Sequence, residues 1–157
     1  MSLELKINEA IKASMLAKDK VRLESLRAIK AAILLAKTAD GAQEISDADV
    51  LKIMQKLVKQ RRESAETYRS AGRDELAAAE AAEAAVIEEF LPKSLSADEL
   101  ETELRKIIAE VGAQSPADMG KVMKAAQGAL AGRADGRAIS ECVKNLLAKK
   151  SFLNVQS

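Results

Sequence analysis

Apolar residues recur along this chain at intervals of three and four positions, and no segment alternates apolar with polar residues. Such intervals place apolar side chains on one side of an α-helix, whereas a half-buried β-strand would alternate. The pattern therefore predicts an all-α fold. The first apolar residues of the successive predicted helices are Leu3, Leu23, Leu51, Leu76, Leu100, Met119 and Ile139.

Capping residues and helix breakers set the expected bounds of these helices. Ser46, with Asp49 three residues later, resembles a capping box at the start of the third helix, and Gly72 suits the position after its end. The second helix is expected from about residue 19 to residue 37, and the fourth from about residue 74 to residue 90.

The segment FLPKSLSADE is the clearest internal boundary. Pro92 disfavours helix at the residue before it, and Ser96 with Glu99 forms a second capping box. Further on, the sixth helix should have Ser115 as its N-cap and Pro116 at its first position. The prediction is an N-terminal domain of four helices, a compact C-terminal module of three helices, and a frayed tail, with bounds at residues 1–92, 93–150 and 151–157.

The composition excludes several kinds of active site. The sequence contains no histidine, which excludes catalytic triads with a histidine base, HExxH zinc sites and histidine acid–base catalysis. The one cysteine, Cys142, lies in an apolar stripe and is expected to be a small core residue rather than a reactive thiol.

The sequence also bears on compartment. No segment approaches the ~18 apolar residues of a membrane span, and the charged N-terminus does not resemble a signal peptide. A single cysteine fits a reducing environment. We therefore expect a cytoplasmic protein that does not interact with membranes.

No cofactor, metal or nucleotide site is predicted, and no catalytic residue is identified. Gly120 and Lys121 have the wrong spacing for a phosphate-binding loop, Val122 stands where Ser or Thr is required, and no strand precedes them. The segment DADV, residues 47–50, lacks the glycine and the later acidic residues of a calcium-binding loop.

A formal net charge of +1 conceals an uneven distribution in the C-terminal module. Residues 94–118 carry a net charge of −4, whereas residues 119–150 carry a net charge of +5. The basic end of the module is therefore where an anionic partner would be attracted.

The sixth predicted helix carries glycines in an unusual place. On a helical wheel its apolar residues lie within about 60° of one line, whereas Gly120, Lys121, Lys124 and Gly128 lie on the flank and back. Glycine within a helix costs about 1 kcal/mol relative to alanine, and core packing does not explain it here. A bare basic surface would let the phosphate backbone of RNA approach closely. Alternatively, the two glycines are merely tolerated on a solvated surface.

The turn GRADGR, residues 132–137, follows this helix. It places Arg133 and Arg137 near the N-terminus of the next helix, where the helix dipole and the arginines both favour an anion. These two arginines are therefore added to the candidate RNA-binding residues.

The segment KQRRES places Arg61 on the apolar seam of the third helix. With a turn near Gly72, an antiparallel hairpin sets Arg61 opposite Glu83, because each lies eleven residues from the turn. The favoured interpretation is a partly buried ion pair that fixes the register of the two helices. The alternative makes Arg61 and Arg62 contacts to phosphate, and Lys59 and Arg62 are counted among the candidate RNA-binding residues.

Four segments together resemble the GatB/YqeY family, specifically its small stand-alone YqeY-like proteins. They are KDKVRLESLRAIKAAI (18–33), VKQRRESAETYRSAGRDELAAAEAAE (58–83), EEFLPKSLS (88–96) and DMGKVMK…GRADGR (118–137). The resemblance covers about residues 2–148 and implies an all-helical fold in two parts. It also implies a C-terminal module similar to the tail domain of the GatB subunit of the glutamine-dependent tRNA amidotransferase. In that enzyme the tail engages tRNA, while the kinase and amidase chemistry resides elsewhere.

Three hypotheses for function follow. The first is a tRNA-associated binding module, with tRNA or another RNA as the expected partner. The second is an amide-transfer enzyme, since the family label reads carbon–nitrogen ligase with glutamine as amido donor. The missing histidine, amidase loop and nucleotide loop count against it. The third is a protein–protein adaptor whose basic surface meets an acidic partner.

Overall fold

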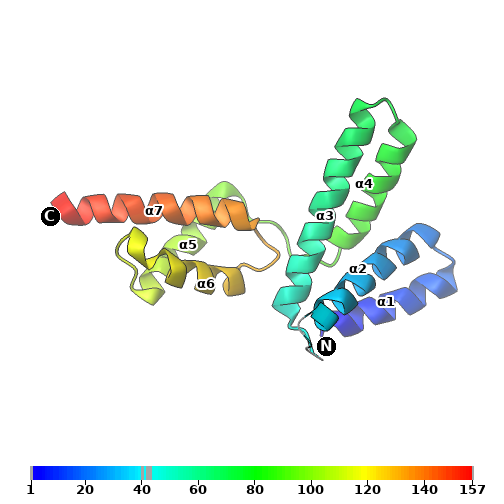
Figure 1. Ribbon diagram of the computed structural model, residues 1–157, viewed down its shortest axis with the longest axis horizontal. Coiled ribbons are helices and arrows are strands. Elements are labelled where there is room, and N and C mark those ends of the chain that lie inside the picture. The colour runs from blue at the N-terminus through cyan, green and yellow to red at the C-terminus, as the bar shows by residue number, and fades with distance from the viewer. Residues whose placement is uncertain (1, 40, 42–43, 157) are drawn as a thin grey trace. The chain divides into compact units, whose positions relative to one another are not determined.

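The computed structural model describes residues 2–39, 41 and 44–156, and every regular element in these residues is helical (Figure 1). The prediction of an all-α fold is confirmed. In chain order the elements are α1 (Leu3–Ala17), α2 (Lys20–Ala39), α3 (Asp47–Ser70), α4 (Asp74–Glu88), α5 (Ala97–Val111), the 3₁₀ turn η1 (Pro116–Asp118), α6 (Met119–Ala129) and α7 (Gly136–Gln156).

The contacts of the chain divide it into two compact units, Met1–Pro92 and Lys93–Ser157. The first unit consists of two helical hairpins, α1 with α2 and α3 with α4 (Figure 1). All four helices contribute to one apolar core, which removes the apolar side of each helix from water. Its buried residues are Ile7, Leu26, Ile29, Ile33, Val50, Met54 and Ile87.

The second unit packs α5, α6 and α7 around a core of its own. The buried residues of this core are Leu100, Leu104, Ile107, Ile108, Ala113, Val122, Ala126, Leu130, Ile139, Val143, Leu146 and Leu147. Cys142 packs against them, and burial raises the pKa of its thiol, as expected for a small core residue.

The predicted capping residues lie at the starts and ends of the helices α3 and α5. The Ser46 hydroxyl accepts the N–H of Asp49 at 3.2 Å at the start of α3. Ser96 and Glu99 each accept the other's backbone N–H at 3.1 Å, which forms the reciprocal capping box of α5. Gly72 and Gly112 follow α3 and α5 with φ values of 75° and 70°, a conformation that glycine adopts without strain.

The helix α7 continues to Gln156, through most of the segment predicted as a frayed tail (151–157), whose residue 157 lies outside the described residues. No glycine or proline follows Gly136, so the sequence contains no helix breaker near residue 150. The ammonium of Lys150 also donates a hydrogen bond to the carbonyl oxygen of Ala113 at 2.8 Å. This bond ties the last part of α7 to the loop that follows α5.

Other helix bounds also differ from the prediction, and α2 ends at Ala39, two residues after its predicted end. The helix α6 begins at Met119, because residues 116–118 form a 3₁₀ turn. The Asp118 carboxylate accepts the backbone N–H groups of Gln114 at 2.8 Å and Ser115 at 3.4 Å, which holds the chain in this tighter turn. The helix α4 ends at Glu88, two residues before the predicted end.

The second unit should fold without the first. Because its core and the capped helix α5 lie within residues 93–157, we expect this fragment to show helical circular dichroism and a cooperative thermal transition. Its length, about 65 residues, makes its stability marginal. A random-coil spectrum in buffer would contradict an independent unit.

Replacing Lys150 with alanine should destabilise the protein by on the order of 1–2 kcal/mol. The change leaves the Ala113 carbonyl without the charged donor, and hydrogen bonds to charged groups contribute about 1.5–3 kcal/mol. The neighbouring Lys149 is exposed, so Lys149→Ala should change the free energy of unfolding by less than about 0.5 kcal/mol. Urea unfolding followed by circular dichroism measures both, and equal stabilities would show that Lys150 does not hold α7.

Candidate nucleic-acid interface

The rotation of α6 is set by its apolar residues. Val122, Ala126 and Leu130 are buried against α5 and α7, and Met119 and Met123 pack at the edge of the same core. The opposite side of the helix therefore faces solvent. We call it the glycine–lysine side of α6, and its four members, Gly120, Lys121, Lys124 and Gly128, are all exposed.

Neither glycine on this side has a structural reason to be glycine. A Cβ atom added to Gly120 or Gly128 would meet none of the described residues within 4 Å outside its own stretch of helix, so none of them excludes a side chain there. Neither residue has the positive φ of Gly112 or Gly132, so the backbone does not require glycine either. Alanine would fit at both positions and would favour the helix by about 1 kcal/mol at each.

The two lysines of this side differ in their surroundings. Lys121 lies close enough to Asp118 to contribute to lowering the pKa of that carboxyl, although the backbone hydrogen bond from Gln114 is the larger cause. Among the described residues, no carboxylate forms a salt bridge with Lys121 or Lys124. Both ammonium groups are exposed, so a phosphate can reach them.

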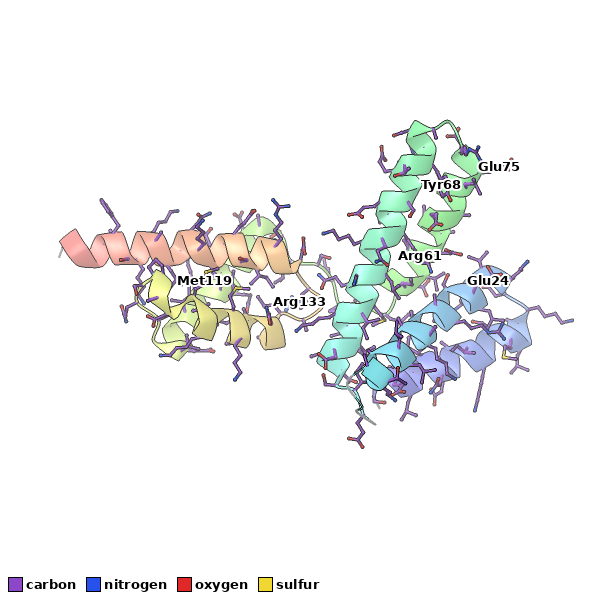
Figure 2. The ribbon with its side chains drawn as sticks, viewed as in Figure 1. Glu24, Arg61, Tyr68, Glu75, Met119 and Arg133 are labelled. Carbon is purple, nitrogen blue, oxygen red and sulfur yellow. The ribbon has the colours of Figure 1, made fainter. Side chains whose placement is uncertain are left out.

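Arg133 lies in the turn between α6 and α7 and is half-buried (Figure 2). Its carbonyl oxygen accepts the N–H of Leu95 at 2.8 Å, which ties this turn to the segment that precedes α5. Its guanidinium lies near Glu99. The Ser96 hydrogen bonds chiefly lower the pKa of that carboxyl, and the charges of Lys93 and Arg133 lower it further.

Arg137 lies in the first turn of α7 and is highly exposed, and its Nε is 3.4 Å from the Glu141 carboxylate one turn later. The four predicted basic residues therefore differ in position. Lys121 and Lys124 share the outward side of α6, Arg133 lies beside the start of α5, and Arg137 lies on α7.

In the first unit, Arg61 and Glu83 lie opposite each other in the α3–α4 hairpin, as their spacing from Gly72 predicts. Arg61 of α3 (labelled in Figure 2) pairs with two carboxylates of α4, with Nη1 3.0 Å from Glu83 Oε2 and 3.6 Å from Glu80 Oε2. The three side chains are 21–25% exposed. Arg61 Nε is buried and finds no hydrogen-bond partner among the described residues. The spacing places Glu80 on the same seam as Glu83, three residues earlier, but its contact with Arg61 was not predicted.

Arg62, a candidate RNA-binding residue, is already engaged within the hairpin. Its Nε and Nη2 donate to the same oxygen of Glu88, at 3.2 and 3.0 Å. A phosphate contact by Arg62 would have to replace this ion pair. Lys59, on the same helix, is exposed.

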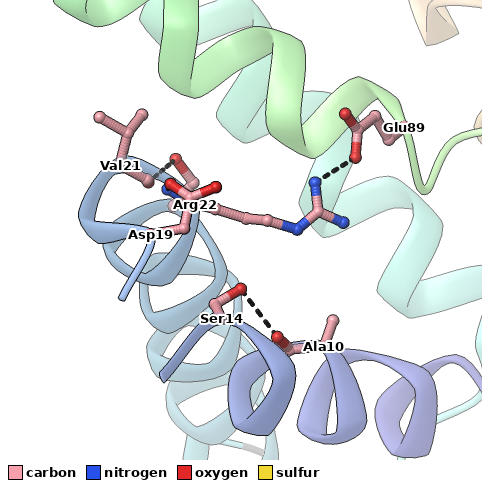
Figure 3. A network of polar contacts seen from close by, with 7 residues as sticks. Ala10, Ser14, Asp19, Val21, Arg22 and Glu89 are labelled. Atoms are coloured by element: carbon pink, nitrogen blue, oxygen red, sulfur yellow. Dashed lines mark hydrogen bonds and ion pairs between the residues drawn. The ribbon is translucent and has the colours of Figure 1, made fainter. Parts of the chain in front are cut away.

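An ion pair between the two hairpins of the first unit was not predicted. Arg22, at the start of α2, reaches Glu89 just after α4 at 2.5 Å (Figure 3), and its guanidinium lies 5.8 Å from the centre of the Phe90 ring. In the same region the buried hydroxyls of Ser14 and Ser25 each donate to the carbonyl four residues earlier, at 2.8 Å. The sequence gives no periodic cue for the pairing of Arg22 with Glu89, because 67 positions separate them.

The family model for YqeY-like proteins matches residues 4–147. This chain belongs to the YqeY-like family. A curated protein to which it is similar is altered inheritance of mitochondria protein 41, mitochondrial, of Meyerozyma guilliermondii, with 36% identity over 107 residues. That match covers 66% of this chain and 55% of the relative, so the chain spans about half of the relative's length.

The residues matched by the YqeY-like family model include the glycine–lysine side of α6. They also include Arg61, Glu80 and Glu83, which we call the Arg61 cluster. Within the described parts of this YqeY-like protein, no helix is sufficiently long and apolar to cross a bilayer. The same residues contain no group of three or more Cys, Asp or Glu side chains that could hold a metal ion.

Arg61→Ala should destabilise this YqeY-like protein by on the order of 2 kcal/mol. The change leaves Glu80 and Glu83 without their cation, and breaking a fully buried pair costs about 3–5 kcal/mol. The smaller figure reflects the residual solvent exposure of all three groups. Chemical unfolding of the full chain measures the loss.

Arg69 of the same helix provides the matched control. It pairs with Glu66 at 2.7 Å, but both side chains are at least 60% exposed, so Arg69→Ala should cost less than about 0.5 kcal/mol. The triple change of Arg61, Glu80 and Glu83 to leucine should recover much of the loss caused by Arg61→Ala. If Arg61→Ala is as mild as Arg69→Ala, the cluster does not fix the hairpin.

Proposed function

We propose that this YqeY-like protein is a tRNA-associated accessory protein whose C-terminal module binds the RNA backbone with the glycine–lysine side of α6. The resemblance of this module to the tail domain of GatB supports tRNA as the partner. The proposal assigns no amide-transfer chemistry to the chain, because its sequence offers no catalytic residues for it.

One observation carries the proposal, namely that two exposed helical glycines flank two exposed lysines without a structural need for glycine. Each glycine weakens the helix by about 1 kcal/mol, and no contact within the unit requires it. Close approach by another molecule would explain these glycines, because a backbone without side chains lets a bulky chain come near the lysine ammonium groups. The RNA phosphate backbone is such a chain and is attracted by the same lysines.

The competing proposal is a protein adaptor that presents the same side of α6 to an acidic protein. The charge of residues 119–150 would serve either partner. We favour RNA because of the GatB resemblance. A pull-down with and without nuclease separates the two, since only an RNA-dependent association is lost on digestion.

We propose a cytoplasmic location for this function, because a single cysteine fits a reducing environment. The Meyerozyma relative carries a mitochondrial name, so fractionation of cells is the direct test of compartment.

The lysines of α6 should contribute counterion release to RNA binding. We expect Lys121→Ala and Lys124→Ala each to lower the slope of log affinity against log salt by about 0.7–0.9. Arg105→Ala is the matched control in the same unit, because Arg105 pairs with Glu101 at 2.7 Å on the acidic helix α5. Its slope should equal that of the unchanged protein. Titration of labelled tRNA at several salt concentrations measures all three, and equal slopes for every variant would contradict the proposal.

Added bulk on the glycine–lysine side should block binding without harming the fold. Gly128→Leu should weaken tRNA binding and leave the thermal midpoint unchanged or raised, because the site is open and leucine favours the helix. Ala129→Leu is the control, since Ala129 is exposed but lies about 100° around the helix from Gly128. It should not change binding. If Gly128→Leu binds tRNA like the unchanged protein, RNA does not approach this side of α6.

A further inference from the structure

The helix α7 presents a second exposed surface, on the side opposite its core residues. At about 100° per residue, Arg137, Glu141, Lys144, Ala148 and Phe152 lie within about 60° of one line. All five are exposed, and Phe152 keeps 62% of its surface in solvent. Lys149, also exposed, is one turn before Phe152 on the flank of this surface.

The direction of Phe152 is set by the bond that holds the end of α7. The Lys150 ammonium donates to the Ala113 carbonyl oxygen at 2.8 Å, so this side of the helix faces the loop after α5. Phe152 lies about 200° around the helix from Lys150 and therefore points away from that loop. Phe152 is therefore exposed because the bond from Lys150 to Ala113 fixes the rotation of α7.

An exposed aromatic ring is unusual in this chain, which has only two phenylalanines and one tyrosine. Phe90 and Tyr68 are both partly buried, and Phe90 lies under the Arg22 guanidinium. Proteins that bind single-stranded nucleic acid combine such a ring with neighbouring cations, because every base offers a flat face for stacking and every nucleotide adds a phosphate. Phe152 with Lys149 has this combination.

The surroundings of Phe152 fit other partners less well. A stable protein interface buries at least about 1,200 Å² in total, whereas the outward surface of α7 and its flank expose only two large apolar side chains among the described residues, Phe152 and Leu153. A helix that lies in a membrane surface has a broad apolar side, which α7 uses for its core.

We propose that Phe152 stacks on an unpaired base while Lys149 contacts the adjoining phosphate, so that the protein prefers RNA with a single-stranded segment beside its duplex. This inference rests on the proposed function, because it requires the C-terminal module to bind RNA. It adds a second contact on α7 and names the part of the RNA that is bound there. Both residues lie outside the residues that the family model matches.

The test uses the full chain and two labelled RNAs with the same stem, one blunt and one with a short unpaired overhang. We expect the overhang RNA to bind roughly fivefold to a hundredfold more tightly than the blunt RNA. Phe152→Leu keeps apolar bulk but loses the ring, and should abolish this preference without changing affinity for the blunt RNA. Phe152→Trp should keep the preference. Circular dichroism establishes that each variant is folded.

The outcomes separate this inference from the function on which it rests. If the unchanged protein binds both RNAs equally and Lys124→Ala still lowers the salt slope, the stacking contact is wrong and the proposed function stands. If it binds neither RNA, both are wrong. If Phe152→Leu keeps the preference, or if Phe152→Ala alters only self-association or binding to anionic vesicles, Phe152 does not stack on RNA.

Discussion

Burial of Val122, Ala126 and Leu130 against α5 and α7 fixes the rotation of α6. That rotation determines which residues of the candidate interface are exposed to solvent. A surface helix buries one apolar side, so the residues on its opposite side are the ones that a partner can contact. Here the remaining side consists largely of glycine and lysine. The same constraint acts on α7, where burial of Ile139, Val143 and Leu147 leaves a basic surface that ends at Phe152.

The two units use their positive charges differently. In the first unit, arginines of α2 and α3 pair with carboxylates on or just after α4, as in Arg22 with Glu89, Arg61 with Glu83 and Arg62 with Glu88. These pairs fix how the helices meet, so binding a phosphate there would disturb the fold. In the second unit, each salt bridge found among the described residues joins neighbours on one helix. Cations of the second unit are therefore the better candidates for binding RNA.

Local rules predicted most of the fold because every regular element among the described residues is a helix. Apolar spacing and the caps at Ser46 and Ser96 depend on residues a few positions apart, and the sequence displays them directly. The pairing of Arg61 with Glu83 could be predicted as well, because one short turn fixes the register of a hairpin. The bond from Lys150 to Ala113 and the pairing of Arg22 with Glu89 could not, because each joins distant segments whose approach depends on the packed core. The helical end of α7 was missed because no capping residue marks it.

The most direct test of the proposed RNA-binding surface is a titration of the ¹⁵N-labelled protein with tRNA, in which the backbone amide resonances of its glycines are followed. These resonances occupy a region of their own in the spectrum, so Gly120, Gly128 and Gly112 can be compared in one experiment. Binding along the glycine–lysine side of α6 predicts that the resonances of Gly120 and Gly128 shift or broaden as tRNA is added. The resonance of Gly112, which lies after α5, should change little. Changes at Gly112 without changes at Gly120 and Gly128 would contradict the account, as would a spectrum that tRNA leaves unaltered.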